Sequence, residues 1–305
     1  MYGVGNAFIK IEMRSYMNTQ KPFWYTVLGL FLAALVLAGA GFGKASGKAT
    51  ERTPETIEQL DGKKLGGVAG KMTETHLKLL WETILGITLQ GYESYATIDE
   101  LLFALKDGRV DAIWCPDITA SYLTAQDETL YELEQQEALI DRFSFAMAFL
   151  PEDEVVCTAV SKAIETLEQN GTLTGLVEAY VEAENPITRY EKEMSKQDGE
   201  RIYIGVTGTV PPIDRFDKDG KPCGFSVALL DEIGKCTGYQ FVLVPVDAET
   251  AFTCLENGKI DAIFGYGTSK NTTPSRTDVV TTTGYYGMNQ YSYVTLKKEV
   301  NEQLN

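Results

Sequence analysis

An internal repeat constrains the fold of this chain more than any other feature. Residues 104–114 read ALKDGRVDAIW, and residues 254–264, 150 positions further along, read CLENGKIDAIF. In each copy a glycine follows a stretch that predicts a helix, and a short apolar run that predicts a strand comes next. An apolar, glycine-bearing run precedes each copy, at residues 64–70 and 201–208. The repeat therefore predicts two strand–helix–strand units, each with a parallel sheet.

A third block lies between the two predicted units. Residues 143–149 (FSFAMAF) are typical of a strand, and residues 152–183 read as helices interrupted at Asn170-Gly171. A charged linker follows at residues 191–200. We therefore expect an α/β protein with these parts: an α/β unit over 57–140, a strand with helices over 143–190, a second α/β unit over 201–286, and a strand with a tail over 287–305.

The charge of the chain argues against nucleic acid as a partner. The formal net charge is −16. Residues 1–50 hold five of the 27 basic residues and only one of the 43 acidic residues. The rest of the chain is therefore strongly acidic and would be repelled by phosphate backbones. Five cysteines without a CxxC pair and the single His76 give no basis for a metal site or histidine-dependent catalysis. We expect no metal and no cofactor.

Residues 22–43 form an uncharged run between Lys21 and Lys44. A run of this length can cross a bilayer, so it predicts either a cleaved signal peptide or an uncleaved membrane anchor, followed by a polar tether up to residue 50. Small residues after the run would permit cleavage. We expect the remainder of the chain to be exported to the periplasm or the extracellular face of the membrane, either secreted or anchored by this helix.

Several motifs together resemble the bacterial extracellular solute-binding proteins, family 3, of the polar amino-acid type. The motifs that resemble the family's first lobe are IYIGVTGTVPPIDRFDKDGKPCGFSVALLDEIGKCTG (202–238), NGKIDAI (257–263), TPSR (273–276) and Tyr285-Tyr286. Those that resemble its second lobe and return segment are LDGKKLGGVAG (60–70), GRVDA (108–112), FSFAMAF (143–149) and NGTL (170–173). Each motif alone is weak, and their combined local order carries the resemblance.

The resemblance implies a fold and a function. The fold is a bilobal one similar to type II periplasmic binding proteins, with two parallel-sheet lobes joined by hinge strands behind an N-terminal hydrophobic helix. The function is capture of a small polar solute, such as an amino acid, for the membrane subunits of an ABC importer, without enzyme activity. Here, however, the second-lobe motifs precede the first-lobe motifs. This order indicates either a circular permutation or a fragment of two tandem copies.

The resemblance also implies a set of binding residues. Arg276 aligns with the arginine that holds the ligand's α-carboxylate, and Asp117 aligns with the acid that receives its α-ammonium group. Arg276 could instead be a solvated turn residue, and Asp117 a helix cap. Further candidates are threonines that would line the cleft or belong to turns, a lysine that would favour an acidic ligand or point to solvent, and aromatic residues that could equally be core: Thr73, Thr207, Thr209, Thr268, Lys71, Tyr266 and Trp114.

Two other function classes stay open. A membrane-tethered sensing module of a signalling system would use the same clamp, and an uncleaved N-terminal helix would favour it. A few relatives of this fold act as dehydratases, but no activated nucleophile, metal set or phosphate loop is evident in the sequence.

Overall fold

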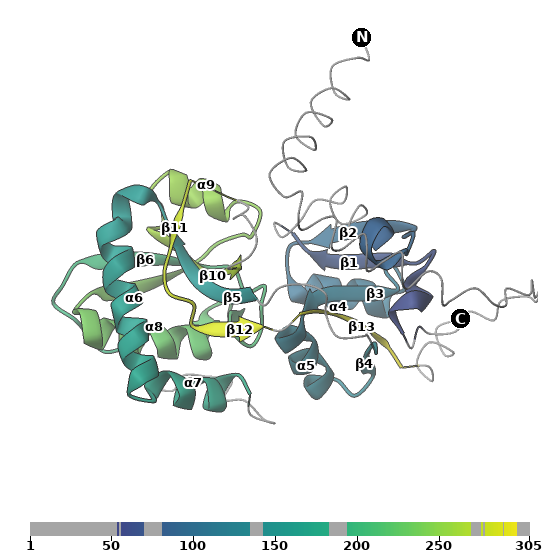
Figure 1. Ribbon diagram of the computed structural model, residues 1–305, viewed down its shortest axis with the longest axis horizontal. Coiled ribbons are helices and arrows are strands. Elements are labelled where there is room, and N and C mark those ends of the chain that lie inside the picture. Colours follow the sequence, from purple (N-terminus) through teal and green to yellow (C-terminus); the bar gives the residue numbers. More distant parts are fainter. Residues whose placement is uncertain are drawn as a thin grey trace, which may run out of the picture. The chain divides into compact units, whose positions relative to one another are not determined.

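The computed structural model describes residues 54, 56–69, 81–134, 143–182, 194–269, 276, 278–288 and 290–297. All of them belong to one unit, Arg52–Asn305. They form two larger β-sheets with helices packed on them (Figure 1), and a small β-hairpin. The predicted membrane helix at residues 22–43 lies outside the described residues. Among the residues that are described, no helix is long and apolar enough to span a membrane.

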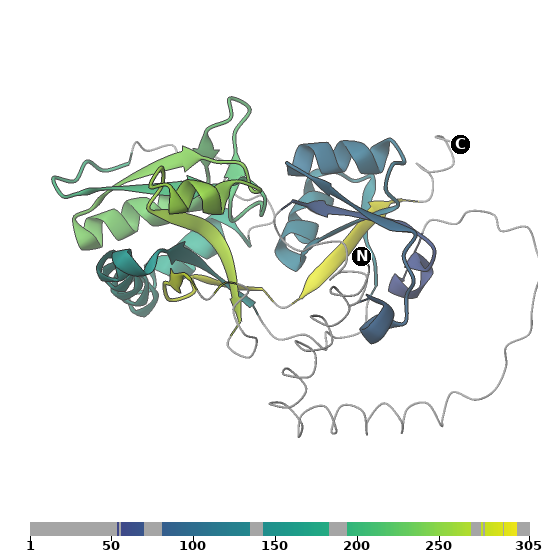
Figure 2. The same ribbon diagram turned by 90° about the horizontal axis from the view of Figure 1, so that it is seen from above.

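The first sheet, called here the β1 sheet, has five strands in the order β2-β1-β3-β13-β4. Its strands are β1 (Lys64–Val68), β2 (Gly91–Tyr95), β3 (Ala112–Pro116), β4 (Leu130–Glu132) and β13 (Tyr291–Leu296). β1 runs parallel to β2 and β3, as predicted, whereas β13 runs antiparallel to β3 and β4. In Figure 2 the yellow strand β13 lies among the blue strands of this sheet. The helices of this part are η1 (Ile57–Leu60), η2 (Trp81–Leu85), α4 (Ile98–Lys106) and α5 (Asp117–Gln126).

The second sheet, called here the β6 sheet, has six strands in the order β11-β5-β10-β6-β9, with β12 also paired to β5. Its strands are β5 (Phe143–Phe149), β6 (Arg201–Val206), β9 (Gln240–Pro245), β10 (Ala262–Ser269), β11 (Val280–Thr281) and β12 (Tyr286–Met288). β6 is parallel to β9 and β10, and β5 is antiparallel to β10, β11 and β12. The prediction of purely parallel sheets is thus corrected: each sheet is mixed, because a strand from elsewhere in the chain joins it.

Helices cover the β6 sheet on both faces. The helices are η3 (Pro151–Asp153), α6 (Glu154–Gln169), α7 (Thr172–Tyr180), α8 (Phe225–Thr237) and α9 (Ala251–Glu256). Apolar residues of α6, α7 and α8 form one core with Phe149, Ile204 and Phe264 of the strands. Apolar residues of α9 form a separate core with Ile260 and Ile263. β5 lies inside the sheet, between β11 and β10. Helices α6 and α7 both pack against α8 (Figure 1). The hairpin of β7 (Arg215–Phe216) and β8 (Pro222–Cys223) precedes α8.

The structure explains the glycine and aspartate that the two copies of the repeat share. Gly108 follows α4 with φ 71°, and Gly258 follows α9 with φ 67°, a left-handed conformation that favours glycine. The repeated aspartates then fix the register of the parallel pairs. The Asp111 carboxylate accepts a hydrogen bond from Lys64 N at 2.8 Å, and the Asp261 carboxylate accepts one from Tyr203 N at 2.7 Å. Each aspartate thus ties the start of one strand to its parallel neighbour, at the first residue of β1 and the third residue of β6.

Candidate functional site

A cavity of about 350 Å³ lies where parallel strands of both sheets end. Val68 and Pro116 are the last residues of β1 and β3, and Thr207 follows β6 directly. In open α/β sheets the crevice beyond the carboxyl ends of the strands is the usual ligand site. The residues that line it are Val68, Ala69, Trp114, Cys115, Pro116, Phe145, Thr207, Thr209, Ala248, Ala251, Phe252, Ile263, Phe264, Gly265, Tyr266, Gly267, Met288 and Tyr291.

One wall of the cavity is a stack of aromatic rings. The rings of Trp114 and Tyr291 are stacked with centroids 4.1 Å apart and an interplanar angle of 14°. Trp81 packs edge-on against Trp114, at 5.9 Å and 82°, and its Nε1 donates a 2.7 Å hydrogen bond to the hydroxyl of Tyr293. Burial raises the pKa of Tyr291 and of Tyr293 to about 12, so both rings stay neutral at ordinary pH. The wall is therefore uncharged and held in place from behind.

A second aromatic group comes from α9 and β10. Phe252 and Tyr266 meet edge to face, with ring centroids 6.0 Å apart. The register of β10 against β5 shifts between Ile263 and Tyr266, where Gly265 adopts φ 75°. A bulge of this kind redirects the side chain that follows it. The bulge thus accounts for Tyr266 lying at the cavity rather than continuing the regular alternation of the strand.

The polar corner of the cavity is built around a buried carboxylate. Asp214 is fully buried, and its Oδ2 accepts hydrogen bonds from Thr207 N at 3.1 Å and from Thr207 Oγ1 at 2.9 Å. The Thr207 and Thr209 hydroxyls are 2.8 Å apart. Gly265 lies beside the same carboxylate, since a Cβ at this position would be 3.7 Å from Asp214 Oδ2. A buried carboxyl group therefore lies directly behind the two threonines of the cavity wall.

In this structure the Arg276 guanidinium binds two carboxylates of the protein. Its Nε donates to Asp278 at 2.9 Å, its Nη2 donates to Glu256 at 2.7 Å and also to Asp278, and its guanidinium lies 4.3 Å from the centre of the Phe252 ring. These carboxylates raise the pKa of Arg276, which in turn lowers that of Asp278 to about 2. Arg276 is not among the described residues that line the cavity, but it packs on the ring of Phe252, which does line it.

The other predicted site residues divide into three groups. Trp114, Thr207, Thr209 and Tyr266 line the cavity. Asp117 begins α5 next to the cavity-lining Pro116, where its Oδ1 accepts from Ile118 N at 2.8 Å, and Thr268 lies in β10 and donates to the Ser144 carbonyl at 3.1 Å. Lys71 and Thr73 lie outside the described residues.

Sequence reasoning missed Phe145, Phe252, Tyr291 and Asp214. Phe145 and Tyr291 belong to runs of alternating apolar residues, FSFAMAF and YSYVTL. Such alternation indicates two faces of a strand but does not tell which face meets a cavity. Asp214 follows the Pro-Pro turn and could have been noticed as an acidic residue in an apolar setting, since VPPID has no other polar side chain.

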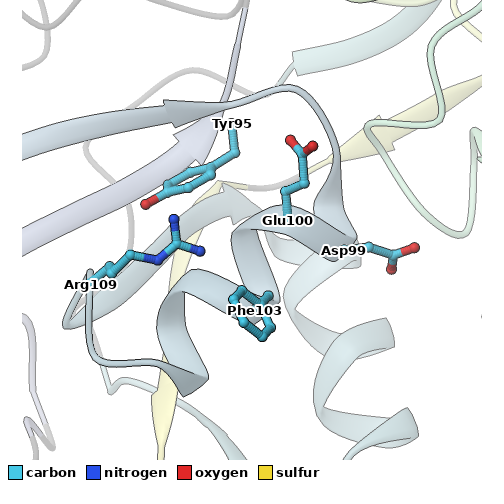
Figure 3. A pocket seen from close by; sticks show the side chains of 5 residues that line it. All are labelled: Tyr95, Asp99, Glu100, Phe103 and Arg109. Atoms are coloured by element: carbon cyan, nitrogen blue, oxygen red, sulfur yellow. The ribbon is translucent and has the colours of Figure 1, made fainter.

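A second, shallower hollow lies on the surface of α4 and is the alternative site. Figure 3 shows the Arg109 guanidinium beside the rings of Tyr95 and Phe103, 5.5 and 5.4 Å from their centres, with Asp99 and Glu100 nearby. Phe103 is 63% exposed. All five side chains come from one surface segment, residues 95–109, and face water. The cavity at the strand ends, which both sheets line, is the better candidate for a small ligand.

Comparison with known proteins agrees with the resemblance for part of the chain. Residues 202–302 match the model of bacterial extracellular solute-binding proteins, family 3. Within this segment lie the strands and helices from β6 to β13, apart from the first residue of β6, and thus many of the cavity residues. This segment is therefore similar in sequence to the family 3 solute-binding proteins. No curated protein matches the chain.

Solved structures show a looser likeness. The ancestral amino acid-binding protein AncCDT-1, a precursor of cyclohexadienyl dehydratase, is 11% identical with a TM-score of 0.42, over 80% of this chain and 85% of the other. The GluR0 ligand-binding core in complex with L-glutamate is 10% identical with a TM-score of 0.41, over 80% and 90%. An arginine transport periplasmic binding protein from Legionella pneumophila is 14% identical with a TM-score of 0.37, over 80% and 92%.

Proposed function

We propose that this protein binds a small organic solute in the aromatic cavity and presents it to the membrane subunits of an ABC importer on the outer side of the cell membrane. One observation carries the proposal: strands of both sheets end at a single cavity of about 350 Å³ lined by six aromatic rings. A volume of this size suits a metabolite. The family match of residues 202–302 supports the same function.

An amino acid is the solute that the family resemblance favours. Its carboxylate would need a cationic partner, and Arg276, the residue expected for this role, is engaged by Glu256 and Asp278. An amino acid would therefore have to displace these carboxylates or use a cation elsewhere, such as Lys71. We therefore propose a small organic solute as the ligand, with no requirement that it carry a carboxylate.

A binding screen with two variants tests the proposed site. Thermal-shift measurements against small metabolites identify a solute, because a ligand that binds only the native state raises its stability. Calorimetry then compares the wild type with Tyr266→Leu, which removes a half-buried ring from the cavity wall, and with Phe103→Ala, which changes the α4 hollow. We expect the first variant to lose most of its affinity and the second to keep it. The opposite pattern would place the site on α4.

The importer role has a separate test. Cells that lack the gene should fail to accumulate the identified solute, and the wild-type gene should restore uptake. Normal uptake in the deletion strain, together with a solute-dependent change in gene expression, would favour the sensing module instead.

A further inference from the structure

The bulge of β10 at Gly265 is fastened from behind by a side chain outside the cavity wall. We propose that the hydroxyl group of Tyr285 is a positioning group, which fixes this bulge and so keeps the ring of Tyr266 at the cavity. This role rests on the proposed function, because it concerns the same site. Tyr285 is 3% exposed and is not among the described residues that line the cavity.

The bulge interrupts the hydrogen bonding between β10 and β5. The pairing passes from Ile263 opposite Ala148 to Tyr266 opposite Ala146. Two residues of β10 thus lie where β5 has one, which is the usual pattern of a bulge. Gly265, the second of the two, is buried and has φ 75°. Its N–H group is closed off from water and needs a partner inside the protein.

The Tyr285 hydroxyl supplies that partner. The Gly265 N–H donates to Tyr285 Oη at 2.9 Å, and the hydroxyl in turn donates to the Ala146 carbonyl at 3.5 Å. One side-chain oxygen therefore bridges the two strands at the point where their ladder is interrupted. Burial raises the pKa of Tyr285 well above its ordinary value, so the hydroxyl keeps the hydrogen that it donates.

Tyr285 is itself held by its ring and by its backbone. The ring stacks on that of Phe264, with centroids 4.9 Å apart and an interplanar angle of 22°, and it also contacts the ring of Phe225 at 6.0 Å. The Tyr285 N–H donates to the Phe145 carbonyl at 2.9 Å. Because both parts of the residue are fixed, the hydroxyl is presented to Gly265 from a defined position.

The bulge decides which side chains of β10 reach the cavity. Adjacent side chains of a regular strand point to opposite faces, yet Phe264, Gly265 and Tyr266 all border the same space. Beyond the bulge, the Tyr266 ring meets Phe252 edge to face at 6.0 Å. Without the bridge, the Gly265 N–H would have to find another partner, and the backbone that directs Tyr266 would rearrange. Tyr285 would thus influence the cavity through Tyr266.

Fluorine NMR tests this role without any ligand. A 3-fluorotyrosine placed at position 266 reports the surroundings of that ring. Tyr285→Phe removes the bridging oxygen and keeps the ring against Phe264. Tyr286→Phe makes the same chemical change at the next residue, which is not among the described residues that line the cavity. We expect the fluorine signal to move or broaden in Tyr285→Phe and to stay in place in Tyr286→Phe. An unchanged signal in Tyr285→Phe, or equal changes in both variants, would overturn the proposal.

Hydrogen exchange in the wild type covers the case in which Tyr285→Phe does not fold. The amides of Thr282 and Tyr285 donate to carbonyls of β5 and serve as references. The Gly265 amide should exchange about as slowly as these two, because it is buried and bound to a fixed oxygen. Exchange of Gly265 at the rate of an exposed amide would show that the bridge is absent and would overturn the proposal.

Binding of indole connects the position of the ring with the function of the cavity. Indole is a neutral planar probe, so the comparison does not depend on charge. In NMR titrations, Tyr285→Phe should weaken indole binding about tenfold and Tyr286→Phe by less than about twofold. When Tyr266→Leu is already present, adding Tyr285→Phe should weaken binding by less than about a further twofold, because the two residues act through one contact. Equal losses with and without Tyr266→Leu would mean that Tyr285 does not act through Tyr266.

The positioning role and the proposed function fail in different ways. If neither indole nor any metabolite of the screen binds the wild type, the proposed function is wrong, and the fluorine signal still decides whether Tyr285 positions Tyr266. If solutes bind but Tyr285→Phe changes neither the fluorine signal nor the affinity for indole, the proposed function stands and the role of Tyr285 is wrong.

Discussion

The ring of Trp114 lies flat against the ring of Tyr291, with 4.1 Å between centroids. The two residues come from β3 and β13, which are neighbours in the β1 sheet although they lie far apart in the chain. Trp114 is 5% exposed, so its ring serves both as the wall of the cavity and as part of the core with Trp81. Stability and ligand binding are therefore coupled at this position.

Removal of the Trp114 ring should destabilise the fold. Trp114→Ala is expected to lower the free energy of unfolding by about 3–5 kcal/mol, as for other large aromatic residues truncated in a core. Trp114→Phe should cost less, because it keeps a ring against Tyr291. Urea denaturation followed by circular dichroism measures both. A loss below about 1 kcal/mol in Trp114→Ala would mean that the stack contributes little to the core.

The hydrogen bond between Trp81 and Tyr293 should be measurable on its own. Tyr293→Phe leaves the buried Trp81 Nε1 without its 2.7 Å acceptor, while the ring contacts remain. We expect a loss of about 1–3 kcal/mol in the free energy of unfolding. The matched control is Tyr203→Phe, at a ring that is 38% exposed, which should change stability by less than about 0.5 kcal/mol. Equal effects of the two variants would contradict the prediction.

Two glycine substitutions should act in opposite directions. A Cβ at Gly199 would lie 2.2 Å from the carbonyl oxygen of Gly238, so Gly199→Ala forces backbone apart and should destabilise the protein by more than about 1 kcal/mol. Gly175 lies within α7 with no atom near its Cβ position. Gly175→Ala should therefore raise stability by about 0.5–1 kcal/mol through the helix propensity of alanine. Thermal melts of both variants decide the matter.

The ion pair of Asp127 and Lys106 should make stability depend on acid pH. The hydrogen bonds from Lys106 and Thr129 lower the pKa of Asp127 to about 2 in the folded protein. A depressed folded-state pKa adds stability above the unfolded-state pKa, and this contribution is lost as the pH falls through the folded-state value. The pair is partly exposed, with Lys106 at 49%, so the contribution should be at most about 1 kcal/mol.

The comparison with Asp127→Asn isolates this effect. The variant keeps an oxygen for Thr129 but loses the charge. Its difference in stability from the wild type should be constant above about pH 5 and shrink steadily between about pH 4 and pH 2. Urea midpoints across this range provide the measurement. A difference that stays constant down to pH 2 would show that the charge of Asp127 does not contribute.

The segment that matches the family model should not fold alone. Residues 202–302 lack β5, which pairs with β10, β11 and β12, and they lack α6 and α7, which supply part of the core. A chain of residues 201–302 is therefore expected to be unfolded or aggregated, whereas a chain of residues 143–290 should unfold cooperatively. Circular dichroism and size-exclusion chromatography distinguish the outcomes. A well-folded 201–302 chain would show that another strand can replace β5.

The sequence predicted those parts of the fold that local rules determine. The repeat gave the helix, the left-handed glycine and the strand in both units, because each depends on a few neighbouring residues. It did not reveal that β13 runs antiparallel to β3, or which strand β5 pairs with among residues 201–286, since strand pairing between distant segments depends on the whole fold. That the chain is circularly permuted, or a fragment of two tandem copies, stays a hypothesis.

The candidate site was predictable to a lesser degree. Thr207, Thr209, Tyr266 and Trp114 lie at the ends of predicted strands, and their position at the cavity follows from that topology. The environment of Arg276 could not be foreseen, because Glu256 and Asp278 reach it from a helix and a turn whose geometry no motif specifies. The hydrogen bonds of Thr207 likewise depend on Asp214, whose burial appears only in three dimensions.

The pairing of β3 with β13 has a consequence for synthesis of the chain. β3 ends at Pro116, and its partner β13 ends at Leu296. At about 5–20 residues per second, a ribosome needs roughly 10 to 40 s to make the intervening residues. Throughout this interval one edge of β3 has no partner strand, because β13 has not been made. For much of the same interval both edges of β5 also lack their partner strands. Newly made chains on one messenger RNA would then expose adhesive strand edges to one another, so shielding by a chaperone during translation should raise the yield of native protein.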